Sequence, residues 1–213
     1  MRLRHALRSQ AGYTVAEMLV ACAVIGMVLA GLLSLLMTGQ QAFVLGSNRT
    51  EALSTGRLVL FRLAEEVRTA GYDPRNTASF AAITALAPPN VGFTIGNDWN
   101  ATGAIETAQT TTVNGTLRGE QITYTVVGTQ LRRQESVIDS SPVTVTNTLN
   151  TITITYLNAD DTDVTATAHQ AATAPLIRTV VITVTTNPDV QESGTVTDVA
   201  LTSTIRARVR NRT

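Results

Sequence analysis

The chain contains very few of the residues on which disulfides, thiolate metal sites and nucleophilic catalysis depend. It has one cysteine, Cys22, and two histidines, His5 and His169. A single cysteine excludes an intrachain disulfide and a metal site built from several cysteines, although an extracytoplasmic domain of this size can fold without a disulfide. A catalytic Cys–His pair would need Cys22, which lies inside a long apolar run. We therefore expect no enzymatic activity and no cofactor.

Positive charge is also limited and unevenly placed. The chain has no lysine, and its 16 basic residues balance 16 acidic ones. Proteins that bind nucleic acid usually carry a basic surface, so we expect no nucleic-acid partner. Arg2, Arg4 and Arg8 precede the first apolar run with no acidic residue among them. The rest of the chain is therefore mildly acidic.

One long hydrophobic run follows these arginines. It extends from Met18 to Met37 without a charged residue. As a helix it would span about 30 Å, the thickness of the hydrocarbon core of a bilayer. Because the arginines precede it, the positive-inside tendency places the N-terminus in the cytoplasm and exports the remainder. A cleaved secretory signal would have a shorter apolar core, of about 7–15 residues. The run could also be an ordinary single-pass anchor or a buried helix of a soluble protein.

Glu17 distinguishes this segment from an ordinary anchor. It lies one position before the uncharged run, within an apolar stretch that begins at Tyr13. An acidic residue at the centre of a membrane helix costs roughly 2.5–3.5 kcal/mol, and less near the interface. A buried acid normally has a partner, and no cation lies nearby on the same helix face. We therefore expect the partner of Glu17 to come from another molecule.

The residues around Glu17 resemble a known processing site. Gly12 followed by residues 13–21 (YTVAEMLVA) resembles the cleavage site of type IV pilins and of type II secretion pseudopilins. In that family a prepilin peptidase cleaves after the glycine and methylates the new terminal amine. The resemblance implies cleavage between Gly12 and Tyr13, N-methylation of Tyr13 and a role of Glu17, the fifth mature residue, in assembly. Tyr13 replaces the usual phenylalanine but keeps an aromatic ring.

The helical pattern continues beyond the apolar run. From residue 49 to residue 70 apolar residues recur with a period near 3.5, which predicts an amphipathic helix. Gly39 and Gly46 are expected to loosen the helix at the membrane exit, and Gly71 and Pro74 are expected to end it. The apolar face is expected to pack against the protein's own sheet, and it carries Leu53, Leu60, Leu63 and Val67.

From residue 78 onward the pattern is that of β-structure. Short alternating segments are separated by Asn-, Asp- and Gly-rich breaks. A long mobile surface loop is expected around TAQTTTVNGT, residues 107–116. The expected strands cover residues 91–95, 110–113, 121–127, 130–134, 151–157, 177–185 and 196–209.

Three further segments resemble PilW-like minor pilins. They are FRLAEEVRTAGYDP (residues 61–74), ITYTVVGTQLRR (122–133) and LTSTIRARVRN (201–211). The resemblance implies an α+β fold of the type IV pilin lollipop kind, in which a long N-terminal helix packs on an antiparallel β-sheet head. It implies a leader peptide (1–12), a transmembrane and assembly helix (13–38), an amphipathic helix (39–71) and a β-rich head (72–213).

The function that follows is that of a structural minor pilin, which assembles into or primes a type IV pilus. Its expected partners are other major and minor pilins through the N-terminal helix, the prepilin peptidase, and the inner membrane before assembly. The head would be periplasmic or extracellular. A J-like pseudopilin of type II secretion and a membrane-anchored binding domain that never polymerises also stay open. A membrane-tethered enzyme would need a catalytic constellation that the sequence does not mark.

The head offers only weak candidates for a ligand site. Asp160, Asp161 and Asp163 follow Asn158 closely, and oxygen ligands at this spacing could bind calcium. The same residues also suit a solvated turn between two strands, and no later glutamate lies at EF-hand spacing. His169 is expected at the surface. Trp99 is expected in a loop, where a role in adhesion stays open.

Overall fold

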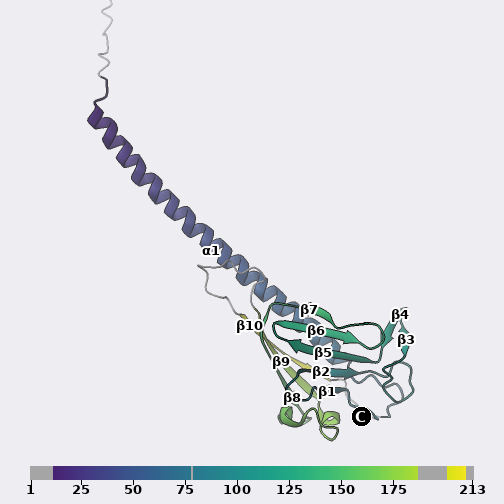
Figure 1. The fold of residues 1–213 in the computed structure, drawn as a ribbon. Helices are drawn as coiled ribbons and strands as arrows, with labels where there is room; N and C mark the ends of the chain where they lie inside the picture. The colour runs from purple at the N-terminus through teal and green to yellow at the C-terminus, as the bar shows by residue number, and fades with distance from the viewer. Residues whose placement is uncertain (1–11, 78, 187–200, 210–213) are drawn as a thin grey trace, which may run out of the picture. The chain divides into compact units, whose positions relative to one another are not determined.

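The computed structural model describes residues 12–77, 79–186 and 201–209 (Figure 1). One helix, α1 (Val15–Thr69), precedes a set of antiparallel strands, which gives the expected α+β arrangement. The described residues form two structural units that divide between Gly46 and Ser47. The first unit contains the apolar part of α1, and the second contains its last turns and all the described strands.

The glycines of α1 do not loosen the helix as expected. The helix runs without a break through Gly39 and Gly46, and a Cβ added at either position would meet nothing within 4 Å. A glycine inside a helix costs only about 1 kcal/mol relative to alanine. The leucine-, methionine- and alanine-rich sequence around these glycines outweighs that cost.

The last part of α1 is amphipathic, as predicted. Leu60, Leu63 and Val67 of the expected face are buried, whereas Leu53 is only half-buried because Ala52 occupies the inner position. Gly71 follows the helix with a φ of 81°, a left-handed conformation that suits glycine at a helix end. The buried residues of α1 are Ala52, Gly56, Val59, Leu60, Leu63, Ala64 and Val67.

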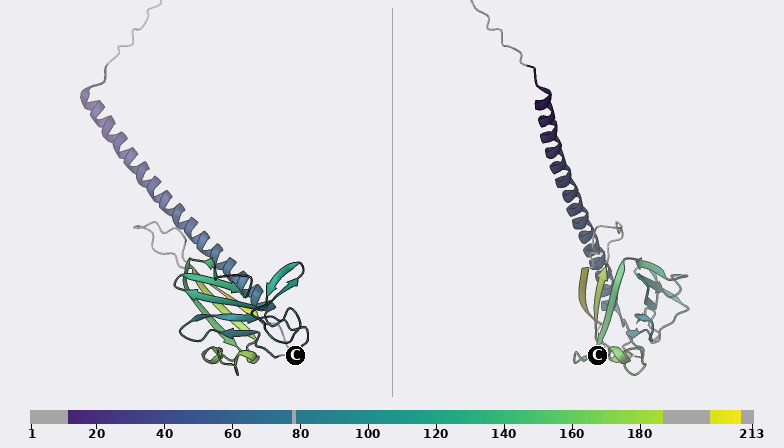
Figure 2. Two further views of the ribbon diagram at one scale, coloured as in Figure 1. Left: turned by 45° about the vertical axis from the view of Figure 1, so that its right-hand side comes forward. Right: turned by 60° about the vertical axis from the view of Figure 1, so that its left-hand side comes forward.

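The strands form two larger antiparallel sheets and one separate hairpin (Figure 2). The order in the five-stranded sheet is β1-β2-β5-β6-β7, and in the three-stranded sheet it is β10-β9-β8. The first sheet contains β1 (Ile83–Ala85), β2 (Val91–Gly96), β5 (Gln121–Val127), β6 (Gln130–Glu135) and β7 (Val143–Thr146). The second contains β8 (Leu149–Leu157), β9 (Thr179–Thr186) and β10 (Leu201–Arg208), and the hairpin contains β3 (Thr110–Val113) and β4 (Thr116–Gly119).

The prediction of a long mobile loop around residues 107–116 was wrong. Strands β3 and β4 pair there as a hairpin. Its two turn residues, Asn114 and Gly115, have φ values of 50° and 79°, as an Asn-Gly hairpin turn requires. Strand β3 confirms the strand predicted at residues 110–113. Strands β1, β4 and β7 were missed, because so few residues rarely establish an alternating pattern. Residues 196–200 of the last expected strand lie outside the described residues.

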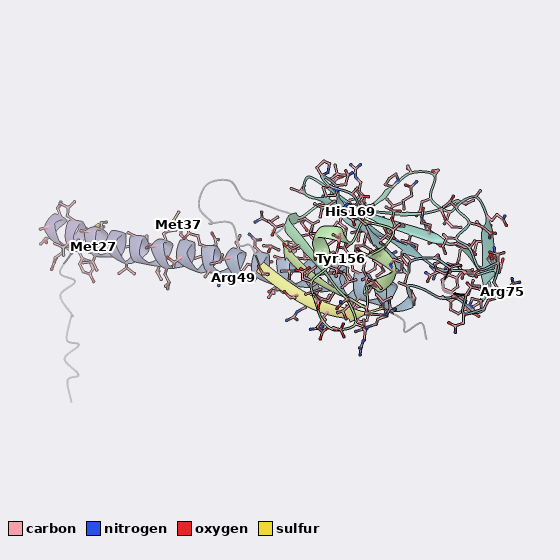
Figure 3. All side chains as sticks on the ribbon, turned by 90° about the horizontal axis from the view of Figure 1, so that it is seen from below. Met27, Met37, Arg49, Arg75, Tyr156 and His169 are labelled. Carbon is pink, nitrogen blue, oxygen red and sulfur yellow. The ribbon has the colours of Figure 1, made fainter. Side chains whose placement is uncertain are left out.

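One hydrophobic core joins the helix to both sheets. The rings of Phe93 (β2) and Tyr124 (β5) lie 5.4 Å apart at their centroids. The hydroxyl of Tyr156, on β8, donates a hydrogen bond of 3.0 Å to the carbonyl of Gly92 on β2 and so links the two sheets. The hydroxyl of Thr186, on β9, donates to the carbonyl of Ala52 at 2.6 Å. Figure 3 marks Tyr156 within the head.

A charged network also connects α1 to the five-stranded sheet. The guanidinium of Arg133, on β6, lies 3.0 Å from Glu66, 2.6 Å from Glu135 and 3.3 Å from Asp139. Burial lowers the pKa of Arg133, but the hydrogen bond to Glu135 and the charges of Glu66 and Glu135 outweigh it and leave that pKa raised. Arg62 lies 3.8 Å from Glu66, so Glu66 bonds more closely across the core than along its own helix.

Candidate processing and assembly site

The residues at the start of α1 form a helix cap. The helix begins at Val15, and its first backbone hydrogen bond runs from the amide of Met18 to the carbonyl of Thr14. The hydroxyl of Thr14 accepts a hydrogen bond of 3.3 Å from the amide of Glu17. The carboxylate of Glu17 accepts in return from the amide of Thr14 at 2.9 Å. This reciprocal pattern is a capping box, and it satisfies amides that a helix start leaves unpaired.

Glu17 therefore has hydrogen-bond partners at the start of its own helix, and a partner from another molecule stays a prediction. Its Oε2 atom accepts from both the amide and the hydroxyl of Thr14, the latter at 3.1 Å. The threonine was not singled out from the sequence, although T-x-x-E before an apolar run is the signature of a capping box. Neither contact neutralises the charge of the carboxylate. Within the described residues, the second oxygen, Oε1, accepts no hydrogen bond and remains accessible to a cation.

Gly12 has no steric role in the described structure. A Cβ built on Gly12 would meet nothing within 4 Å. Tyr13 beside it is 87% exposed. The fold of this chain therefore gives no reason for a glycine at position 12. Any requirement for glycine must come from a molecule that acts on this junction.

The apolar part of α1 has no covering partner within the described residues. All residues from 12 to 43 are exposed, including Cys22. Figure 3 shows Met27 and Met37 projecting from the helix surface. Of the described helices, α1 alone is long and apolar enough to cross a membrane. An exposed apolar surface of this length needs either lipid or other helices around it.

Comparison with known protein families identifies this segment. The prokaryotic N-terminal methylation motif matches residues 7–33. The chain is a type IV pilin-like precursor. The match includes Gly12, Tyr13 and Glu17, and the motif belongs to structural proteins of the pilin and pseudopilin type that mature through a prepilin peptidase. No curated protein matches the chain. The motif ends before the head begins and does not assign a subtype.

The acidic residues of the head lie in a turn after β8. The side chain of Asn158 accepts from the amides of Asp160 and Thr162, both at 2.9 Å. Asp161 forms an ion pair with Arg206 of β10. The carboxylate of Asp163 accepts from the amide of Thr165 at 2.8 Å, and hydrogen bonding to Thr165 lowers its pKa. Among the described residues, no three acidic, histidine or cysteine side chains are grouped closely enough to hold a metal ion.

The two remaining candidates from the sequence lie in different parts of the head. His169 follows the short helix η1 (Thr165–Thr167) and is half-buried. Trp99 lies after β2 and stacks on Tyr72, with their ring centroids 4.9 Å apart. Its indole nitrogen donates to the carbonyl of Gly119 at 3.2 Å. Trp99 is thus a packed loop aromatic that is only half-buried.

Proposed function

We propose that this chain is a minor pilin of the PilW-like kind, which assembles into or primes a type IV pilus after cleavage between Gly12 and Tyr13. The observation that carries this proposal is the exposed, capped start of an apolar helix inside the methylation motif. Cleavage would leave Thr14 as the second mature residue, so the capping box would lie at the new N-terminus. The proposed orientation places the head outside the cytoplasm.

The capping box suggests how Glu17 would act in assembly. Cleavage creates a cation close to the membrane, the amine of Tyr13. Thr14 holds Oε2 of Glu17 and leaves Oε1 exposed, so the carboxylate has a fixed direction before it meets a partner. When helices pack side by side with a stagger, Oε1 can accept from the Tyr13 amine of a neighbouring subunit. The attraction is weakly screened there because little water surrounds the helices.

The PilW-like part of the proposal rests on the sequence resemblance at the end of α1. The Ala70-Gly71-Tyr72 segment follows the helix and bonds to the end of β2 and the residues after it. The amide of Gly71 donates to the carbonyl of Gly96 at 2.9 Å, and the amide of Tyr72 donates to the side chain of Asn97 at 3.1 Å. The segment on which the resemblance rests thus joins the helix to the sheet. A J-like pseudopilin and a non-polymerising binding domain are the competing functions.

The test compares processing with assembly. Glu17→Ala and Glu17→Gln should leave cleavage unchanged, since the junction at Gly12 is intact, and should lower the amount of chain in sheared filaments. Processed chain is measured in membranes and in filaments by immunoblotting. Entry of Glu17→Ala into filaments at the wild-type level would refute the charge-pairing mechanism. If neither the variants nor the wild type enters filaments, the non-polymerising binding domain is favoured.

A second pair of variants tests the role of the cap. Thr14→Val removes the hydroxyl that bonds to Glu17 and should reduce filament entry in the same direction as Glu17→Gln. The matched control is Thr38→Val, because the hydroxyl of Thr38 bonds to the carbonyl of Ser34 in its own helix and not to an acidic residue. Equal filament entry of the two threonine variants would count against an orienting role of Thr14.

A further inference from the structure

A groove in the head combines arginine side chains with the only tryptophan of the chain. Its volume is about 630 Å³, within the roughly 300–1,000 Å³ typical of ligand pockets. The last turns of α1 form one wall, and the loop that carries Trp99 and the strands β4 to β6 form the other. The whole groove lies in the second structural unit. Neither the methylation motif nor the proposed assembly helix includes any of it.

The tryptophan wall of the groove is held rigidly. The buried carboxylate of Glu120 accepts from the amides of Trp99 at 3.0 Å, Asn100 at 3.2 Å and Glu106 at 2.9 Å. The indole nitrogen bonds to Gly119, and the ring stacks on Tyr72. The backbone amide, the indole nitrogen and the ring face of Trp99 each have a partner, so this side chain loses little conformational entropy when a ligand binds. The groove is therefore preorganised on this side.

Three arginines that line the groove retain hydrogen-bonding capacity. Arg68 is exposed and makes no hydrogen bond or ion pair within the described residues. Arg118 reaches Glu135 only at 3.8 Å, and Arg62 reaches Glu66 only at 3.8 Å, both beyond hydrogen-bond length. Their side chains are 44% and 54% exposed. Three guanidinium groups thus face one groove with donors available for a planar oxyanion.

The charge pattern of the groove argues against a long polyanion. Glu65 and Glu66 line it together with the arginines. From Ser47 to the end, the chain has 13 arginines and 15 acidic residues, so it offers no extended basic surface. A nucleic acid, with a phosphate at every nucleotide, would bring charge close to the two glutamates. Carboxylates spaced along a polypeptide can reach the arginines and avoid the glutamates.

We propose that this groove binds a carboxylate-bearing segment of a partner protein. The carboxylates accept hydrogen bonds from Arg68 and Arg118, and an adjacent apolar or aromatic side chain of the segment packs on Trp99. Tryptophan and arginine are among the residues most enriched at energetically dominant positions of protein interfaces.

The test uses Trp99 as the reporter, because the chain has no other tryptophan. The full chain in detergent micelles is titrated with a synthetic peptide that has three glutamates on each side of one leucine, and the change in tryptophan emission gives the affinity. Binding should weaken as salt is raised. Arg68→Ala should weaken it roughly tenfold, because a charge-assisted hydrogen bond to the peptide is lost while the contacts within the described chain are kept. Arg118→Ala should act in the same direction.

The matched control is Arg57→Ala, an exposed arginine of α1 outside the groove, and it should bind the peptide as the wild type does. A six-nucleotide oligothymidine and inorganic phosphate are titrated in parallel. Equal or tighter binding of either would overturn the assignment to a protein segment. An unchanged emission spectrum at millimolar peptide would overturn the site itself, as would equal binding by the Arg68 and Arg57 variants. None of these results bears on cleavage or filament entry.

Discussion

Replacing Arg133 should destabilise the head strongly, because this arginine holds three carboxylates together. The side chain is only 10% exposed and lies within hydrogen-bond or ion-pair distance of Glu66, Glu135 and Asp139. Arg133→Met keeps the aliphatic stem but leaves the three carboxylates close together without this cation. Removal of one partner from a buried ion pair costs about 3–5 kcal/mol. The side chains of Glu66 and Glu135 are 17% and 5% exposed, so screening by water is limited.

The expected loss is a large part of the stability of a small domain, which is about 5–15 kcal/mol. It corresponds to a fall in Tm of roughly 6–20 °C for a domain of this size. Thermal unfolding is followed by the emission of Trp99, which lies in the head. The matched control is Arg132→Met on the same strand, because the guanidinium of Arg132 bonds to the neutral side chain of Gln130. That variant should shift Tm by no more than about 3 °C, as a surface substitution does.

The direction of the pKa shift of Arg133 determines how its contribution to stability depends on pH. The pKa of Arg133 is raised, so its contribution is fully present below the ordinary arginine pKa and is lost only above the raised value. Protonation of Arg133 itself therefore adds no pH dependence between about pH 5 and 9. A double-mutant cycle with Glu66→Gln isolates the pair across α1 and β6. A coupling energy near zero, or a Tm for Arg133→Met equal to that of Arg132→Met, would refute the argument.

Three further outcomes are expected. Gly92→Ala should destabilise the head by several kcal/mol, because Gly92 has a φ of +148° and an added Cβ would lie 2.1 Å from the carbonyl oxygen of Tyr124. The control Gly39→Ala should leave the Tm of the head unchanged, because a Cβ at Gly39 meets nothing within 4 Å. Tyr156→Phe should cost about 0.5–1.5 kcal/mol in denaturant unfolding, because the hydrogen bond between the two sheets is lost while the carbonyl of Gly92 keeps the amide of Leu86 as a donor. Mass spectrometry of chain recovered from membranes should give a methylated N-terminus at Tyr13, and an intact Met1 in cells with an active prepilin peptidase would contradict this.

Features that depend on local pattern could be predicted from the amino-acid sequence. An uncharged run of 20 residues with Glu17 before it can be recognised without tertiary contacts, and the methylation motif matches there. The buried face of α1 follows from its helical period, and strands such as Gln121–Val127 follow from alternation. The hairpin at Asn114 and Gly115 was also within reach of the sequence, since Asn-Gly is a strong turn signal. The first strand of this hairpin was predicted at residues 110–113, but its partner β4 was not.

Contacts between residues far apart in the chain become evident only in the folded protein. Glu66 and Arg133 are 67 positions apart, and no periodicity in either segment indicates that one neutralises the other. The division of the strands into two sheets depends on long-range pairing, which local propensity does not specify. The groove beside Trp99 likewise gathers residues from α1, a loop and three strands. Helix and strand periods are set by neighbouring residues, whereas a charged site or a groove is set by packing between segments far apart in the chain.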